Sequence, residues 1–126
     1  MSSTSPTPES VVQRQLEAFN ARDLETLLSN YATDAEMFEH PSKLVARGAD
    51  ELRTRFMARF AEPNLFAKLV HRVVVRNTVI DHEIVSRTFP EGPGTLELVM
   101  IYEVNDSRIT KAWSIPGEKR FTPEPT

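Results

Sequence analysis

Two side chains that can accept a proton, Glu39 and His40, stand next to each other directly before Pro41. They end a segment that begins at Tyr31 and has the pattern of a first strand. Histidine titrates near neutral pH, where a general base works best. Because neighbouring residues of a strand point to opposite faces, we expect only one of the two to enter a pocket. We predict His40 as a general base at the pocket mouth, with Glu39 second; the alternative is a structural histidine that binds a backbone group.

Three charged residues, Asp81, Glu83 and Arg87, recur at even spacing in residues 78–89, which have the pattern of a strand. Even spacing places them on one face of that strand. Inside a pocket, Glu83 and Arg87 could bracket a ligand, and an acid with an arginine would suit epoxide opening or dehydration. The alternative is a solvated charged ladder or a salt bridge between two copies of the chain, since charges are rarely buried without partners.

The other histidines give weaker signals. The pattern places His71 in a pocket or, alternatively, in the core, and His82 on the surface or at an interface. No two potential ligands have the close spacing of a metal site, so we expect no metal. The chain also lacks a glycine-rich phosphate loop, a nucleophile elbow and a basic stripe. We therefore expect no organic cofactor, no nucleotide and no nucleic acid partner.

Three helices are expected to position these residues from the N-terminal side. Thr7 suits the N-cap of the first helix, and Asp23 suits the N-cap of a second, short one whose apolar stripe ends at Tyr31. A third helix is expected over residues 49–62, with Phe56 on its apolar face. The Tyr31 hydroxyl and the Phe56 ring are predicted at the pocket, although packing is the commoner use of such side chains.

From residue 65 onward the apolar period changes to two, which is typical of strands. The expected strands cover residues 65–76, 78–89, 95–104 and 108–115. Pro116 and Gly117 are expected to end the last of them. Helices first and a long antiparallel meander last predict an α+β domain, with three N-terminal helices packed on one face of a curved sheet.

The length and composition of the chain fit a single domain. The chain has 126 residues, a net charge of -3 and no cysteine, which excludes disulfides and thiolate chemistry. No apolar run approaches the roughly 20 residues of a membrane span, and no signal-peptide pattern is present. We therefore expect no membrane partner and a cytoplasmic location. The domain is predicted over residues 8–120, with disordered tails at residues 1–7 and 121–126.

The order of these elements resembles the nuclear-transport-factor-like superfamily. The residues that carry the resemblance are Val11 to Arg14, Asp34 to Pro41, and Gly117 to Lys119. Within the superfamily the chain is most similar to ketosteroid isomerases and SnoaL-like polyketide cyclases. The resemblance implies a cystatin-like cone, in which a curved, mainly antiparallel sheet wraps three helices around an apolar pocket. It also implies a homodimer formed through the outer face of the sheet.

Ketosteroid isomerases use a tyrosine, an aspartate base and a protonated aspartic acid, and the resemblance gives each a position here. Gln15 takes the position of the tyrosine, and Met100 that of the protonated acid. The base falls on His40 when the segments are aligned at Pro41, and on Glu39 when they are aligned at their start. Met100 donates no hydrogen bond and Gln15 only an ordinary one. Much of the oxyanion stabilisation is therefore lost, and we do not expect a standard steroid isomerase.

Two classes of function fit these expectations. As an enzyme, the protein would do acid–base chemistry of the isomerase or lyase type, without a cofactor, on a small apolar or polycyclic ligand. Gln15 and Tyr31 would orient that ligand, and Glu83 with Arg87 would form a second polar cluster. The alternative is a non-catalytic ligand-binding or dimerisation domain. An open pocket that the base can reach favours the enzyme.

Overall fold

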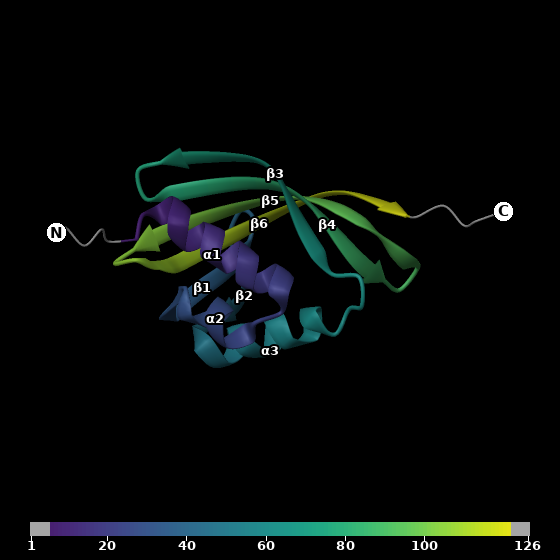
Figure 1. Cartoon of the computed structure of the whole chain (residues 1–126), viewed down its shortest axis with the longest axis horizontal. Helices are drawn as coiled ribbons and strands as arrows, with labels where there is room; N and C mark the ends of the chain where they lie inside the picture. The colour runs from purple at the N-terminus through teal and green to yellow at the C-terminus, as the bar shows by residue number, and fades with distance from the viewer. Residues whose placement is uncertain (1–5, 122–126) are drawn as a thin grey trace.

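The computed structural model describes residues 6–121 and consists of one curved sheet with three helices packed against it (Figure 1). Of the predicted tails at residues 1–7 and 121–126, residues 1–5 and 122–126 lie outside the described residues. The elements, in chain order, are α1 (Pro8–Ala21), α2 (Leu24–Ser29), β1 (Tyr31–Glu39), β2 (Lys43–Arg47), α3 (Gly48–Phe60), β3 (Phe66–Val75), β4 (Thr78–Phe89), β5 (Gly92–Asn105) and β6 (Arg108–Phe121).

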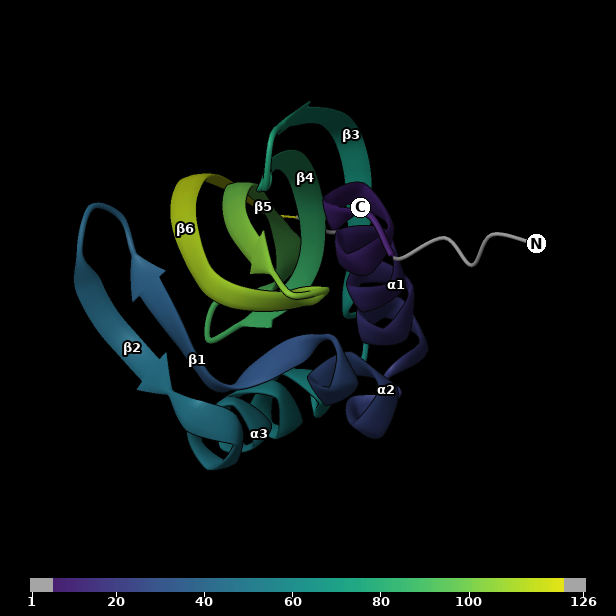
Figure 2. The ribbon, with the colours of Figure 1, turned by 90° about the vertical axis from the view of Figure 1, so that its left-hand side faces the viewer.

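The sheet has six strands in the order β2-β1-β6-β5-β4-β3. All neighbouring strands are antiparallel except β1 and β6, which are parallel. Figure 2 shows the long strands β3 to β6 curling over, with α1 beside them and α2 and α3 below. The α+β, cystatin-like cone predicted from the sequence is confirmed.

The helix starts follow from local chemistry. The Thr7 hydroxyl accepts a hydrogen bond from the Ser10 N–H at 3.1 Å, and the Asp23 carboxylate accepts one from the Thr26 N–H at 3.2 Å. Each side chain satisfies an N–H that has no partner within its helix. The apolar face of α1 then enters the core, where Val11 is fully buried. These contacts hold α1 against the sheet. The residues one turn further along the same face of α1 therefore also point toward the sheet.

The hairpin of β1 and β2 holds the segment on which the sequence analysis concentrated. β1 ends at Glu39, and His40 and Pro41, joined by a cis peptide bond, lie in the turn that leads to β2. The His40 N–H donates to the carbonyl of Ser114 on β6 at 2.9 Å. β2 was not expected, because five residues with two charged ends carry little apolar pattern.

The last strand is longer than predicted: β6 continues through Pro116 and Gly117 to Phe121. The pairing shifts register at this point, with Leu98 opposite Pro116 but Leu96 opposite Lys119. A bulge of this kind accommodates a proline, whose missing N–H cannot join the ladder. The expectation that these two residues end the strand is therefore wrong.

Candidate functional site

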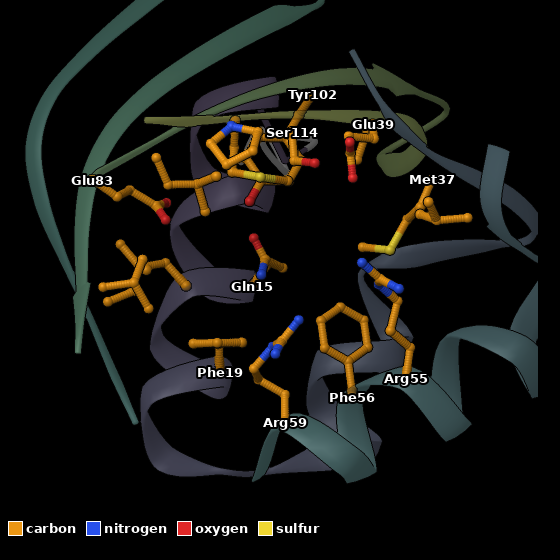
Figure 3. A pocket seen from close by; sticks show the side chains of 18 of the residues that line it. Gln15, Phe19, Met37, Glu39, Arg55, Phe56, Arg59, Glu83, Tyr102 and Ser114 are labelled. Atoms are coloured by element: carbon orange, nitrogen blue, oxygen red, sulfur yellow. The ribbon is translucent and has the colours of Figure 1, made fainter. Parts of the chain in front are cut away.

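A cavity of about 290 Å3 lies between the concave face of the sheet and helices α1 and α3 (Figure 3). Its apolar wall includes Leu16, Phe19, Phe56, Val85, Leu98 and Met100. Its polar lining consists of Gln15, Tyr31, Glu39, Arg55, Arg59, Glu83, Arg87, Tyr102 and Ser114. A mainly apolar cavity with a few convergent polar groups is the usual form of a small-molecule site.

The structure brings most of the residues predicted at the site to this cavity. Those that line it are Gln15, Glu39, Tyr31, Phe56, Glu83, Arg87 and Met100. His40 is exposed in the turn after β1 and does not line the cavity. The structure therefore places Glu39, and not the preferred His40, at the pocket.

Glu83 is a buried carboxyl group on the cavity wall, with only 4% of its surface exposed. Burial and, to a lesser extent, the nearby charge of Asp81 raise its pKa to about 8, against the opposing effect of Arg72. No hydrogen bond to this carboxyl group occurs within residues 6–121. At neutral pH the protonated form of Glu83 therefore predominates. Its O–H group can donate a hydrogen bond to a ligand in the cavity.

Asp81, on the same strand, is fully buried and belongs to an ion pair below the cavity wall. Arg72 on β3 donates to its two carboxylate oxygens from Nε at 2.6 Å and from Nη2 at 2.9 Å. Arg72 also donates from Nη1 to the side-chain oxygen of Gln13 on α1 at 2.9 Å. This bidentate geometry ties β3, β4 and α1 together and fixes the charges next to Glu83.

A register shift on β3 explains how Arg72 reaches Asp81. The pairing of β3 with β4 slips between Leu69 and His71. Strict alternation would place Arg72 on the face opposite Leu69, whereas the shift turns it inward and leaves His71 exposed. The expectation of a pocket or core position for His71 is therefore wrong. Asp81 and Glu83 are buried, so they form no solvated ladder.

Three further polar groups face the same space. Tyr31 and Tyr102 are buried, and burial followed by the charge of Glu83 raises the pKa of both phenols. Gln15 is 5% exposed, and its Oε1 is a buried acceptor without a hydrogen-bond partner in the described part of the chain. In Figure 3 the Gln15 side chain extends from α1 toward the cavity. A buried acceptor left unpaired is costly, so this oxygen is a natural contact for a ligand.

Arg87 lines the cavity but is paired with Glu62 rather than with Glu83. Its Nε and Nη2 donate to the Glu62 carboxylate at 2.7 and 2.9 Å. The same carboxylate accepts from the Thr88 N–H at 2.9 Å and from Arg59 at 3.3 Å. Although burial raises the pKa of Glu62, the hydrogen bonds from Arg87 and Thr88 outweigh it and lower the pKa to about 2.

Glu62→Gln is expected to destabilise the protein at neutral pH. The lowered pKa means that the ionised form stabilises the fold above pH 4.5, and that this contribution is lost as the pH falls toward 2. The variant should lose roughly 3 kcal/mol of unfolding free energy at pH 7, and the loss should shrink below pH 4.5. Urea unfolding of both proteins at pH 3 and 7 measures this, with exposed Glu91→Gln as the control. A pH-independent difference would contradict the assignment.

Four polar lining residues were missed by the sequence analysis: Arg55, Arg59, Tyr102 and Ser114. Arg55 and Arg59 are four residues apart in the sequence, a spacing that puts both on one side of a helix. That spacing could have identified them. Tyr102 looked like one more apolar residue in an alternating strand. Ser114 had no signal, because its place depends on the pairing of β6 with β1.

Within residues 6–121, no group of three or more histidine, aspartate or glutamate side chains is close enough to hold a metal ion. No helix in this range is long and apolar enough to cross a membrane.

Fold and cavity together define a cone-shaped domain of the nuclear-transport-factor-like, ketosteroid-isomerase-like superfamily. The sequence profile of the SnoaL-like domain matches residues 12–112, and the chain belongs to that family. The predicted superfamily is thus confirmed. A search of curated proteins finds no match.

Solved structures with the same fold are numerous. An uncharacterised cystatin-fold protein from Novosphingobium aromaticivorans is 22% identical, with a TM-score of 0.81 over 88% of this chain and 99% of its own. A SnoaL-like protein of unknown function from Burkholderia thailandensis is 21% identical, with a TM-score of 0.72 over 93% and 100%. A protein with a ketosteroid isomerase-like fold from Catenulispora acidiphila, in complex with trimethylamine, is 14% identical, with a TM-score of 0.72 over 86% and 85%. These likenesses concern the fold.

Proposed function

We propose that this protein binds a small, mainly apolar molecule in the cavity and performs acid–base chemistry on it without a cofactor. The observation that carries the proposal is the pair of carboxyl groups on one cavity. Glu39 is exposed at the mouth, whereas Glu83 is buried in the wall with a pKa raised to about 8. Two carboxyl groups in such different environments are suited to opposite roles, one accepting a proton and the other donating a hydrogen bond.

The reaction class that fits is proton abstraction next to a carbonyl group. Glu39 takes a proton from the carbon, and negative charge develops on the carbonyl oxygen. The protonated Glu83 donates a hydrogen bond to that oxygen, and the hydroxyl groups of Tyr31 and Tyr102 are further donors. Return of the proton from Glu39 to another carbon completes an isomerisation. Transfer of that proton to a hydroxyl group, which then leaves as water while the carbon–carbon double bond forms, completes a dehydration.

The proposed hydrogen-bond donor, Glu83, lies on a different strand from the protonated acid of the ketosteroid isomerases, whose position Met100 takes here. Met100 lies on β5, directly opposite Asp81 on β4, and cannot donate. Glu83 lies two residues further along β4, opposite Leu98. A carboxylic acid is thus present on the cavity wall, but it comes from the neighbouring strand. We infer a substrate or pose different from that of a steroid isomerase.

Exchange of the α-protons of 2-tetralone in D2O, followed by proton NMR, tests the proposal. This apolar bicyclic ketone needs only a base and an oxyanion donor. The wild-type protein should accelerate exchange over buffer, and Glu39→Gln should reduce the acceleration about 10²- to 10⁴-fold. His40→Gln is the matched control and should retain the rate. Full activity in Glu39→Gln, or its loss only in His40→Gln, would show that Glu39 is not the base.

A second candidate function is assembly, with or without ligand binding. The edge strand β3 exposes the apolar residues Phe66, Val70, Val73, Val74 and Val75. An exposed apolar edge strand is a surface on which another chain can pair. We propose that two copies of this chain form a homodimer through the β3 side of the sheet.

Val73→Lys together with Val75→Lys is expected to convert the dimer to a monomer, because charges at the edge oppose pairing. Sedimentation equilibrium measures the mass. Leu44→Lys, at an exposed apolar position on β2 at the opposite end of the sheet, is the control and should stay dimeric. If the wild-type protein has the mass of a monomer at about 100 μM, the proposed dimer is wrong. A dimer that neither binds nor exchanges 2-tetralone would favour a purely assembling role.

A further inference from the structure

Two arginines that the proposed chemistry does not use reach into the cavity from α3. Arg55 and Arg59 lie about one helical turn apart, and both line the cavity. In Figure 3 the guanidinium group of Arg59 extends from α3 into the space below Gln15, and that of Arg55 extends toward Met37. Arg55 makes no ion pair or side-chain hydrogen bond within residues 6–121. By contrast Arg53, on the same helix, is engaged by Glu25 at 2.6 Å.

Positive charge exceeds negative charge along this wall. Arg59 and Arg87 share a single carboxylate, that of Glu62. Burial, followed by the charges of Arg87 and Arg55, lowers the pKa of Arg59 against the opposing effect of Glu62. Arg59 is thus close enough to both Arg87 and Arg55 to be repelled by them, with one acid, Glu62, among the three. Glu39 also lines the cavity, but no ion pair joins it to these arginines.

We propose that the ligand carries a carboxylate, held by Arg55 and Arg59, on an apolar body that extends toward Gln15 and Glu83. This inference rests on the proposed function and names the substrate class of the same site. A guanidinium group binds a planar carboxylate through two parallel hydrogen bonds. The mostly apolar lining fits a ligand with one charged end. The ionised form of Glu39 would repel a second charge.

The opposite end of the ligand is specified by the inner polar groups. The unpaired Oε1 of Gln15 accepts a hydrogen bond, and the protonated Glu83 donates one. A hydroxyl or carbonyl group on the inner end of the ligand satisfies one or the other. With its carboxylate fixed by α3, the ligand has one orientation in the cavity. The geometry therefore selects an amphipathic acid, such as an aromatic or polycyclic carboxylic acid, over a neutral hydrocarbon.

Naphthalene-2-carboxylate and naphthalene-2-carboxamide test this inference, because they have nearly the same shape and differ in charge. Each is titrated against the protein bound to the neutral fluorescent probe N-phenyl-1-naphthylamine, and displacement gives both affinities. Wild type should bind the carboxylate at least tenfold more tightly than the amide at low salt. Arg55→Gln should reduce this preference to below threefold and leave amide binding unchanged. Arg59→Gln should act likewise, and Arg53→Gln should keep the full preference.

The possible outcomes separate the inference from the function on which it rests. If the probe and the amide bind but the carboxylate has no advantage, the inference is wrong and the cavity remains a binding site. If the preference persists in Arg55→Gln and Arg59→Gln, these arginines do not hold the anion. If neither compound nor the probe binds, both proposals fail. Arg55 is exposed and unpaired among the described residues, so Arg55→Gln tests the inference without disturbing the Glu62 cluster.

Discussion

Asp81→Ala is expected to lower the free energy of unfolding by about 3–5 kcal/mol, the cost typical of breaking a buried ion pair. Asp81 is fully buried, and both of its carboxylate oxygens accept hydrogen bonds from Arg72 at 2.6 and 2.9 Å. The alanine variant leaves the guanidinium group of Arg72, whose side chain is only 9% exposed, without its counter-ion. Urea unfolding at pH 7 measures the loss.

A double variant tests whether Asp81 and Arg72 stabilise the protein as a pair. Asp81→Leu combined with Arg72→Met removes both charges and should cost much less than the sum of the single variants, because neither charge is then stranded. Glu25→Ala, which breaks the exposed pair with Arg53, is the control and should change stability little. Additive losses in the double variant would show that the pair does not act as a unit.

Glu83→Gln is expected to change the pH dependence of stability more than Glu62→Gln does, because the pKa of Glu83 is shifted further. The pKa of Glu83 is raised from 4.5 to about 8 in the folded protein, so the folded state favours the protonated carboxyl group. Below pH 4.5 both states hold the proton and there is no penalty. As the pH rises from 4.5 to 8 the unfolded state releases the proton first, and stability falls. The full penalty, on the order of 5 kcal/mol, is present above pH 8.

The variant has no titrating group at this position, so it should be more stable than wild type at pH 9 and similar at pH 4. Urea unfolding across this range gives the comparison, and Glu91→Gln, at an exposed position, should track wild type. A carbon-13 NMR titration of Glu83 in Asp81→Asn provides a second check. The pKa of Glu83 should fall there, since the charge of Asp81 raises it and Arg72 would be left unopposed. Parallel pH profiles for wild type and Glu83→Gln would disprove the raised pKa.

The fold could be predicted because its signals are local and repeat along the chain. The caps at Thr7 and Asp23 and the change of apolar period near residue 65 each depend on a few neighbouring residues. Their order was enough to indicate three helices followed by an antiparallel meander. The strand ends were less certain, since β6 passes through Pro116 by means of a register shift that depends on β5.

The site was harder to predict because single-residue shifts decide which side chains face inward. The register shift near Leu69 turns Arg72 toward Asp81. No residue type in β3 indicates that the register shifts there. The choice between Glu39 and His40 depended on one extra residue in the segment. The pKa of Glu83 depends on burial beside Asp81, which requires three-dimensional neighbours. Residue spacing and the family resemblance gave the candidates, and the geometry of the sheet selected among them.

The parallel pairing of β1 with β6 has a consequence for the order in which the protein is made. Glu39 lies opposite Ser114, so the strand that presents this carboxylate to the cavity is anchored by a segment that leaves the ribosome after β2 to β5. Pairing of residues so distant in sequence must overcome a large loop-closure entropy before it contributes stability. The helices and the β3–β5 meander can form from earlier, local contacts. A nascent chain therefore completes most of its scaffold before its proposed base is in position.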